Sequence, residues 1–173
     1  MTCIEVYGDY YDDGGEIVSS GVYIYATELG GNVQKTPSMN FPYPKDSTEW
    51  AQGAERKFID MLSVDEEMNF SGLITADSLR DGHTEAVTGT TVWDPLDALK
   101  RMMTYPSMDE GTCKSIIVFD SNTALGDTRI AWEGEAFPLK LNWKIVPTDE
   151  DVPSQIEVTM SFQKGTDLMK EEH

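Results

Sequence analysis

The chain is 173 residues long, which suits a single domain with a real hydrophobic core. Its 31 acidic and 13 basic residues give a net charge of −18 at pH 7, which argues against nucleic-acid binding by phosphate neutralisation and against anionic membrane surfaces. No apolar run is long enough to span a membrane, and the N-terminus lacks the basic start and apolar stretch of a signal peptide, so we expect the protein to stay, at first, in the cell that makes it.

The acidic residues are spread along the chain, which predicts an acidic surface and not a disordered acidic tail. Such a surface suits solubility at molar salt, or a wall that must not bind a passing polyanion such as DNA. An ordinary acidic soluble protein is the plainer alternative. Cys3 and Cys113 are too few and too far apart for a disulfide framework, and we expect both to be reduced.

The first segments of the chain are polar. We expect residues 1–20 to form an N-terminal arm, with a turn at Gly14 and Gly15. Residues 22–25 are rich in β-branched and aromatic types, which predicts a strand.

Residues 30–46 carry three prolines and two glycines, which predicts an extended loop. The apolar residues Met39, Phe41 and Tyr43 alternate within it. Two interpretations are equally open: these side chains pack against a neighbouring subunit, or they cover the core of their own chain.

The middle of the chain contains one ambiguous segment and one strand. Residues 47–62 fit an apolar stripe on a helix, although their end fits a strand equally well. Residues 68–75 predict a strand in which Gly72 marks a bulge or a close backbone approach.

The clearest helix covers residues 95–104. Asp94 is a good N-cap residue, and the proline that follows it suits the first helical position. Leu96, Leu99 and Met103 line one face of this short helix, which therefore needs a sheet to pack on.

The remainder predicts strands only. Residues 115–119 form an apolar strand, and residues 129–137 form another that Pro138 ends. Residues 139–145 and 156–162 alternate strictly between apolar and polar types, which indicates one face on a core and one face in water. The tail at residues 166–173 is polar.

We therefore predict a single mainly β domain: a two-sheet antiparallel β-sandwich or partial barrel with one short flanking α-helix and an extended loop or arm. The order of the strands within it is left open.

No catalytic residue and no cofactor site is indicated. The two histidines are His173, the last residue, and His83 in a polar turn, so a general base is hard to find. The phosphate-binding glycine motifs are absent from the sequence. We predict a protein that is not an enzyme.

One acidic cluster is a weak candidate for a hard cation such as calcium. It lies near the glycines of the first turn and consists of Asp9, Asp12, Asp13 and Glu16. A chain with this much acid produces such clusters by chance, so the plainer interpretation is a solvated turn.

The order of segments from residue 58 to residue 165 resembles that of the tail tube proteins of long-tailed viruses, and of related baseplate and tail-end proteins. The quoted pattern is FSGLIT after FIDMLSVDEEM, the helix DPLDALKRMM, the strands SIIVF and RIAWEGEAF, and the closing strands LKLNWKIV and QIEVTMSFQKG. It is a resemblance of pattern and order, without a diagnostic motif.

The resemblance implies a homohexameric ring whose copies contribute strands to a shared inner barrel, with rings stacked into a tube for DNA. The partners would be further copies and other tail proteins, and the location would be the virion tail, assembled in the host cytoplasm. DNA would be a cargo that does not stick, and the acidic balance looks like that of a virus of a halophilic archaeon. The segment at residues 30–46 would then contact another subunit.

Within such a ring, the polar face of an alternating strand would face the lumen. The candidate lumen-facing residues are Glu157, Thr159, Ser161 and Gln163. The alternative is Lys140, Asn142 and Lys144, but two lysines in a lumen would slow DNA, so we expect their strand to present them elsewhere. Two other functions stay open: a tail completion or baseplate protein that forms one ring, and a β-sandwich carbohydrate-binding module.

Overall fold

The computed structural model describes residues 2–35, 39–43, 55–59, 64–83, 85–105, 114–120, 129–147 and 153–165. The predicted tail at residues 166–173 and Cys113 lie outside this part of the chain, and so do the side chains of Met39, Phe41 and Tyr43. The chain divides into two units, one of Met1–Gly31 and Glu67–His173 and the other of Asn32–Glu66.

Strands dominate both units. In chain order the elements are β1 (Thr2–Tyr11), β2 (Ile17–Lys35), β3 (Met39–Tyr43), β4 (Glu55–Ile59), β5 (Val64–Ile74), the 3-10 helix η2 (Ala76–Ser78), β6 (Leu79–Asp81), β7 (Glu85–Ala86), α1 (Trp93–Thr104), β8 (Lys114–Asp120), β9 (Arg129–Ile145) and β10 (Ile156–Lys164). In the smaller unit, β3 pairs with β4.

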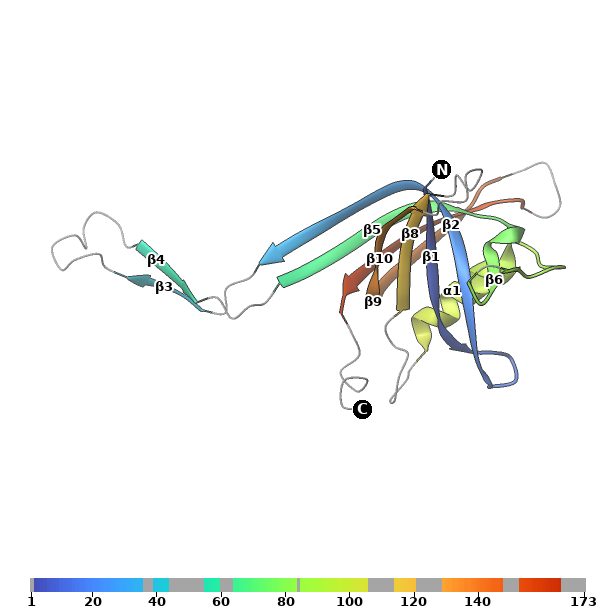
Figure 1. The fold of residues 1–173 in the computed structure, drawn as a ribbon, viewed down its shortest axis with the longest axis horizontal. Coiled ribbons are helices and arrows are strands. Elements are labelled where there is room, and N and C mark those ends of the chain that lie inside the picture. Colours follow the sequence, from blue (N-terminus) through green and yellow to red (C-terminus); the bar gives the residue numbers. More distant parts are fainter. Residues whose placement is uncertain are drawn as a thin grey trace. The chain divides into compact units, whose positions relative to one another are not determined.

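The other strands form one antiparallel sheet that returns to its first strand. Its order is β1-β8-β9-β10-β5-β2-β6-β7, and β1 also pairs with β2. Two long strands belong to both halves of this sheet. β9 pairs with β8 through residues 129–136 and with β10 through residues 136–145, while β2 pairs with β1 through residues 17–25. The protein is therefore mainly β, with the sandwich or partial barrel that the sequence predicted (Figure 1).

The core lies inside this curved sheet, against α1. Its buried members come from six strands and the helix, and include Ile4, Val6, Val22, Ile24, Phe70, Ile74, Leu96, Leu99, Met102, Ile116, Val118, Ala136, Ile156, Val158, Met160 and Phe162. β10 shows the cause most clearly, because its side chains alternate between buried and less buried along the strand. The period-2 pattern of its sequence is thus confirmed.

The start of α1 differs from the prediction. The helix begins at Trp93 and ends at Thr104. Val92 takes the N-cap position, and Asp94 lies inside the first turn, where its carboxylate accepts a hydrogen bond from the Thr91 backbone N–H at 2.7 Å. Asp94 is therefore not the N-cap, but it still satisfies a backbone donor at the start of the helix.

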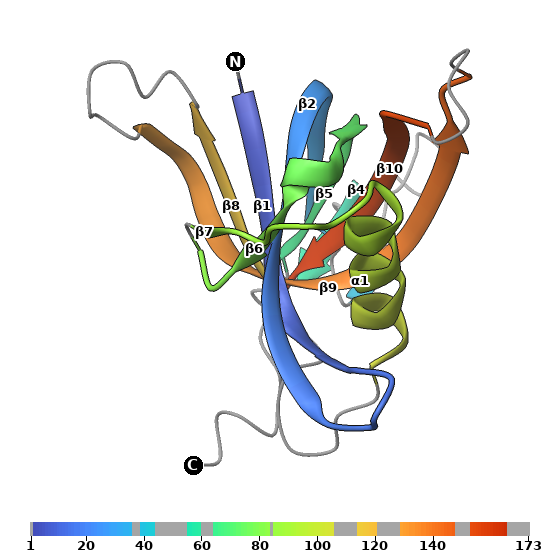
Figure 2. The ribbon, with the colours of Figure 1, turned by 90° about the vertical axis from the view of Figure 1, so that its right-hand side faces the viewer.

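The buried face of α1 is close to the predicted one. Leu96, Leu99 and Met102 are fully buried, whereas Met103 is only partly buried. The helix packs against β1 and β9, and Figure 2 shows it alongside the strands. The prediction that this short helix needs a sheet is confirmed.

The prediction of an N-terminal arm over residues 1–20 is wrong. β1 pairs with both β2 and β8, and it buries Ile4 and Val6 in the core. The turn at Gly14 and Gly15 is confirmed, and Gly15 has a φ of 77°, which favours glycine. β1 looks polar because only one of its faces meets the apolar core.

The segment of residues 30–46, predicted as an extended loop, contains strand structure. β2 continues to Lys35, and Met39–Tyr43 is a strand that pairs with Glu55–Ile59. The second of these strands also answers the ambiguity over residues 47–62 for its described part. A proline is tolerated in β3 because a two-stranded sheet consists only of edge strands.

Pro138 does not end a strand, contrary to the prediction. β9 continues through it, with Pro138 opposite Phe162 and Lys140 opposite Ser161. Leu139 is therefore an extra residue in a β-bulge, a place where a sheet accommodates the missing proline N–H.

Gly72 marks a close backbone approach, as predicted. A Cβ atom at this position would lie 2.5 Å from the Tyr25 carbonyl oxygen and 2.6 Å from Ile24 Cγ2. The absence of a side chain at Gly72 lets β5 and β2 lie this close together.

Candidate assembly surface

A polar face covers the half of the sheet made by β5, β10 and β9. Directly paired residues of an antiparallel sheet point to the same side. The three rows that cross this face are Leu73–Glu157–Lys144, Ser71–Thr159–Asn142 and Asn69–Ser161–Lys140. Gln163 continues the face between Glu67 and Phe137. We call this set of residues the polar face.

The expectation that the lysines of residues 139–145 lie elsewhere is wrong. Pairing places Lys140 and Lys144 on the same face as the four predicted lumen residues of β10. Lys144 stands directly opposite Glu157, an arrangement in which opposite charges attract. The polar face is therefore mixed in charge and not purely acidic.

Hydroxyl groups also join neighbouring strands on this face. Ser71 Oγ and Thr159 Oγ1 lie 3.0 Å apart, within hydrogen-bonding distance. Thr27 Oγ1 of β2 donates to the Ser71 carbonyl oxygen at 3.2 Å, so β2 continues the same half of the sheet. The order of this half is β9-β10-β5-β2.

Each end of this four-stranded half has an open edge within the described part of the chain. Residues 137–145 of β9 pair with β10 only, since the β8 partners end at Ala136. Residues 26–31 of β2 lie beyond the β1 partners, which end at Tyr25. We call these two stretches the β9 edge and the β2 edge. An open edge presents unpaired backbone N–H and C=O groups, which invite another strand.

Large apolar side chains are exposed along both edges. Trp143 is 44% exposed and Ile145 39% on the β9 edge, and Leu29 is 44% exposed on the β2 edge. Natural proteins usually protect edges with charges or prolines, and exposed apolar side chains there favour association.

Trp143 belongs to a small aromatic group beside α1. Its ring meets Trp93 of the helix edge-on, with 6.5 Å between ring centroids. The Lys100 ammonium lies 4.4 Å from the centroid of the Trp143 ring, a cation–π contact. Lys100 meets no carboxylate in the described structure, so its charge is available to a partner.

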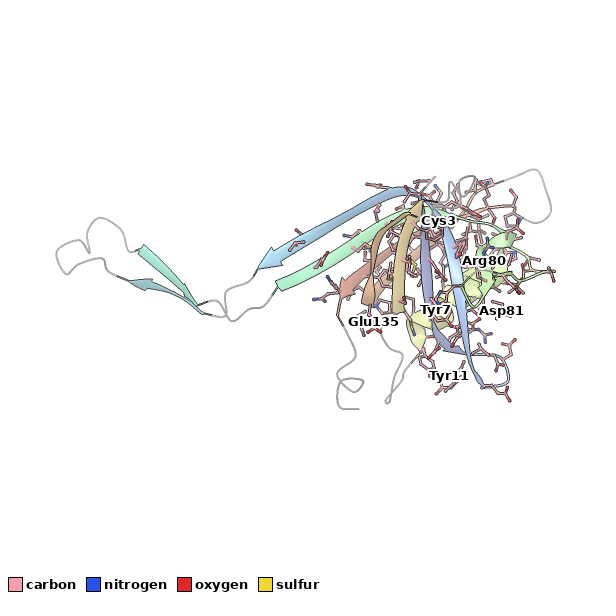
Figure 3. All side chains as sticks on the ribbon, in the orientation of Figure 1. Cys3, Tyr7, Tyr11, Arg80, Asp81 and Glu135 are labelled. Atoms are coloured by element: carbon pink, nitrogen blue, oxygen red, sulfur yellow. The ribbon has the colours of Figure 1, made fainter. Side chains whose placement is uncertain are left out.

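The opposite side of the molecule carries a second cluster, beneath the turn between β6 and β7. His83 Nδ1 lies 2.9 Å from Glu5 Oε1, and the Tyr7 ring stacks on the His83 ring at 4.1 Å. The Arg80 guanidinium lies 4.2 Å from the centroid of the Tyr23 ring. In Figure 3, Cys3, Tyr7 and Tyr11 follow one another along β1.

Burial controls the ionisation of this second cluster. It raises the pKa of the Glu5 carboxyl above its ordinary 4.5, and the His83 hydrogen bond and the charges of His83 and Arg80 offset only part of that rise. Burial also raises the pKa of the Cys3 thiol to about 12. Because only a thiolate is a good nucleophile, Cys3 and His83 do not form a catalytic pair at neutral pH.

The acidic cluster predicted as a cation site is not assembled. Asp12 Oδ1 accepts hydrogen bonds from the backbone N–H groups of Gly14 and Glu16, at 2.9 and 2.8 Å. Asp9 accepts from the Ser19 hydroxyl, and Asp13 pairs with Arg101 of α1. Among the described residues, no group of three or more Cys, His, Asp or Glu is placed to hold a metal ion.

Sequence reasoning missed both edges. The signal was the length of the apolar pattern around Pro138, because β9 has 17 residues and β2 has 19, far above the usual 5 to 6. A strand this long outruns its partners, and the surplus becomes an open edge.

Comparison with known proteins adds no name. No protein-family model matches the chain, and no curated protein matches its sequence. In the part of the chain that the structure describes, no helix has the length and apolar character needed to cross a membrane.

Proposed function

We propose that this protein is a virion structural protein that assembles into hexameric rings, stacked as the tail tube of a long-tailed virus. The observation that carries the proposal is the four-stranded half-sheet β9-β10-β5-β2, which has a polar face and an open edge at each end. The resemblance in the order of segments along the chain supports the same function.

The two edges suit a head-to-tail ring. They lie at opposite ends of the half-sheet, so the β9 edge of one copy meets the β2 edge of the next. Four alternating antiparallel strands put these end strands in opposite directions, and the new pair is antiparallel like its neighbours. Such a heterologous contact generates a closed ring when the rotation closes.

Six copies make a lumen of useful width. Four strands from each copy give a barrel of about 24 strands, and at about 4.8 Å per strand the diameter is roughly 40 Å or more once the strands tilt. The core side of the half-sheet is covered by the rest of each copy, which leaves the polar face for the lumen.

The mixed charge of the polar face is compatible with DNA as a passing cargo. Lys144 is opposed by Glu157 within the same row. Paired lysines release fewer counterions on contact with phosphate than free ones, so the face holds DNA weakly.

The test is negative-stain electron microscopy with analytical ultracentrifugation of the purified protein, at low and at molar salt. Rings or tubes are expected, and more of them at high salt, because salt screens the repulsion between copies of charge −18. Tubes favour a tail tube protein, and single rings favour a completion or baseplate protein. A strict monomer at every salt and protein concentration contradicts the proposal.

The carbohydrate-binding alternative has less support. Sugar binding by aromatic side chains needs an open ring face, and Trp143 has Lys100 over its ring. Trp93 and Trp143 also stand nearly perpendicular, at 83°, and so do not form a flat platform.

A further inference from the structure

The two open edges match in length and in the sides to which their residues point. After the bulge at Leu139, the β9 edge offers the six residues 140–145. The β2 edge, residues 26–31, also has six. Pro138 has no N–H to donate and Leu139 is out of register, so a neighbouring strand that pairs with β9 stops near residue 140.

Full overlap of the two edges fixes one antiparallel register. It sets Ala26 opposite Ile145 at one end and Gly31 opposite Lys140 at the other. Thr27 then lies opposite Lys144, on the polar face of both copies, because Thr27 bonds to β5 from that side of β2 and Lys144 is paired with Glu157. A one-residue slip would put core-side residues on the polar face and is excluded.

The same register brings Glu28 of one copy opposite Trp143 of the next. Ile24 and Ala26 pack on the core, so Glu28, two residues further along the strand, points to the core side. Trp143 also points to that side, since its partner Val158 is buried. Lys100 already lies over the Trp143 ring, and a Glu side chain directly opposite reaches that ammonium.

We infer that Glu28 of one copy pairs with Lys100 of the next across the β2–β9 contact, above the Trp143 ring, and that this ion pair sets the register of the ring. The inference rests on the proposed function, because it names the contact by which the proposed rings close. Glu28 is exposed and forms no ion pair within the described part of its own chain.

A charge-reversal cycle tests the pair. The variants are Glu28→Lys, Lys100→Glu and the double reversal, with Glu16→Lys as a control that makes the same charge change on the exposed β1–β2 turn. Ring formation is measured by sedimentation velocity over a range of protein concentrations. Each single reversal is expected to raise the concentration needed for rings by about tenfold or more, because like charges then face each other. The double reversal is expected to return to within about threefold of the wild type.

The outcomes separate the two levels of the argument. If the wild type forms no rings, the proposed function is refuted and the register with it. If the wild type forms rings but the double reversal does not recover, or the single reversals behave like Glu16→Lys, then the rings stand and this register is overturned. Thermal melts of each variant, read by circular dichroism, check that the monomer fold is intact; an unchanged melt is expected because Glu28 is exposed and Lys100 is not buried.

Discussion

Val158→Asp is expected to destabilise the protein severely and to prevent assembly. Val158 is fully buried in the core, on β10 between its partners Gly72 and Trp143. The change loses the burial of the valine side chain, about 1.5 kcal/mol. It also places a carboxyl among apolar groups, where the ionised form is costly.

The size of the loss follows from the pKa of an aspartate. To stay neutral in the core at pH 7, an Asp with an ordinary pKa near 3.9 must take up a proton at a cost of about 4 kcal/mol. Together with the lost burial this gives about 5 to 6 kcal/mol, comparable with the whole stability of a small domain. Below about pH 4 the proton costs little, and the loss should shrink towards the burial part alone.

Thr159→Asp is the matched control. It introduces the same charge one residue along, on the polar face, and removes one hydroxyl hydrogen bond to Ser71, worth about 1 kcal/mol. Urea unfolding of the two variants and the wild type at pH 7 and pH 4, followed by electron microscopy, makes the comparison. A Val158→Asp protein as stable as Thr159→Asp, or one that still forms rings, would refute the assignment of the buried face.

Three further predictions concern the fold. Gly72→Ala should lose about 1–3 kcal/mol of unfolding free energy, because the new Cβ would lie 2.5 Å from a backbone oxygen; Gly165→Ala, with nothing within 4 Å, should change it by less than about 0.5 kcal/mol in the same urea titration. Gly8→Ala should also lose about 1–3 kcal/mol, since its Cβ would lie 2.3 Å from Cδ of the buried Lys114 side chain, and a chemical melt indistinguishable from wild type would contradict this packing. For Glu5 the folded-state pKa lies above the unfolded value, so the folded state binds the proton more tightly and stability is lost as pH rises from about 4.5 through the folded pKa. The stability of Glu5→Gln relative to wild type should therefore increase over that pH range, whereas Glu16→Gln, on the exposed turn, should show no such trend.

The sequence alone determined much of the local structure. The strict alternation in residues 156–162 fixed which side of β10 is buried, because side chains in a strand alternate between its two faces. The proline after Asp94 and the spacing of Leu96 and Leu99 located the helix to within two residues. The paired glycines at 14 and 15 marked a turn for the conformational reason that Gly15 confirms.

Only the tertiary structure decided which strands lie together and where the sheet ends. β1 looked like a polar arm because half of its face meets the outer cluster around Glu5, which no local pattern reveals. Lys144 and Glu157 share one face because β9 pairs with β10, and pairing over a distance in sequence is invisible in either strand taken by itself. Open edges arise where a strand outlasts its partners, so they depend on the lengths of several strands at once. Composition and periodicity act within a strand and fix its faces, whereas the neighbours and edges on which assembly depends are fixed by the free energy of the whole packed sheet.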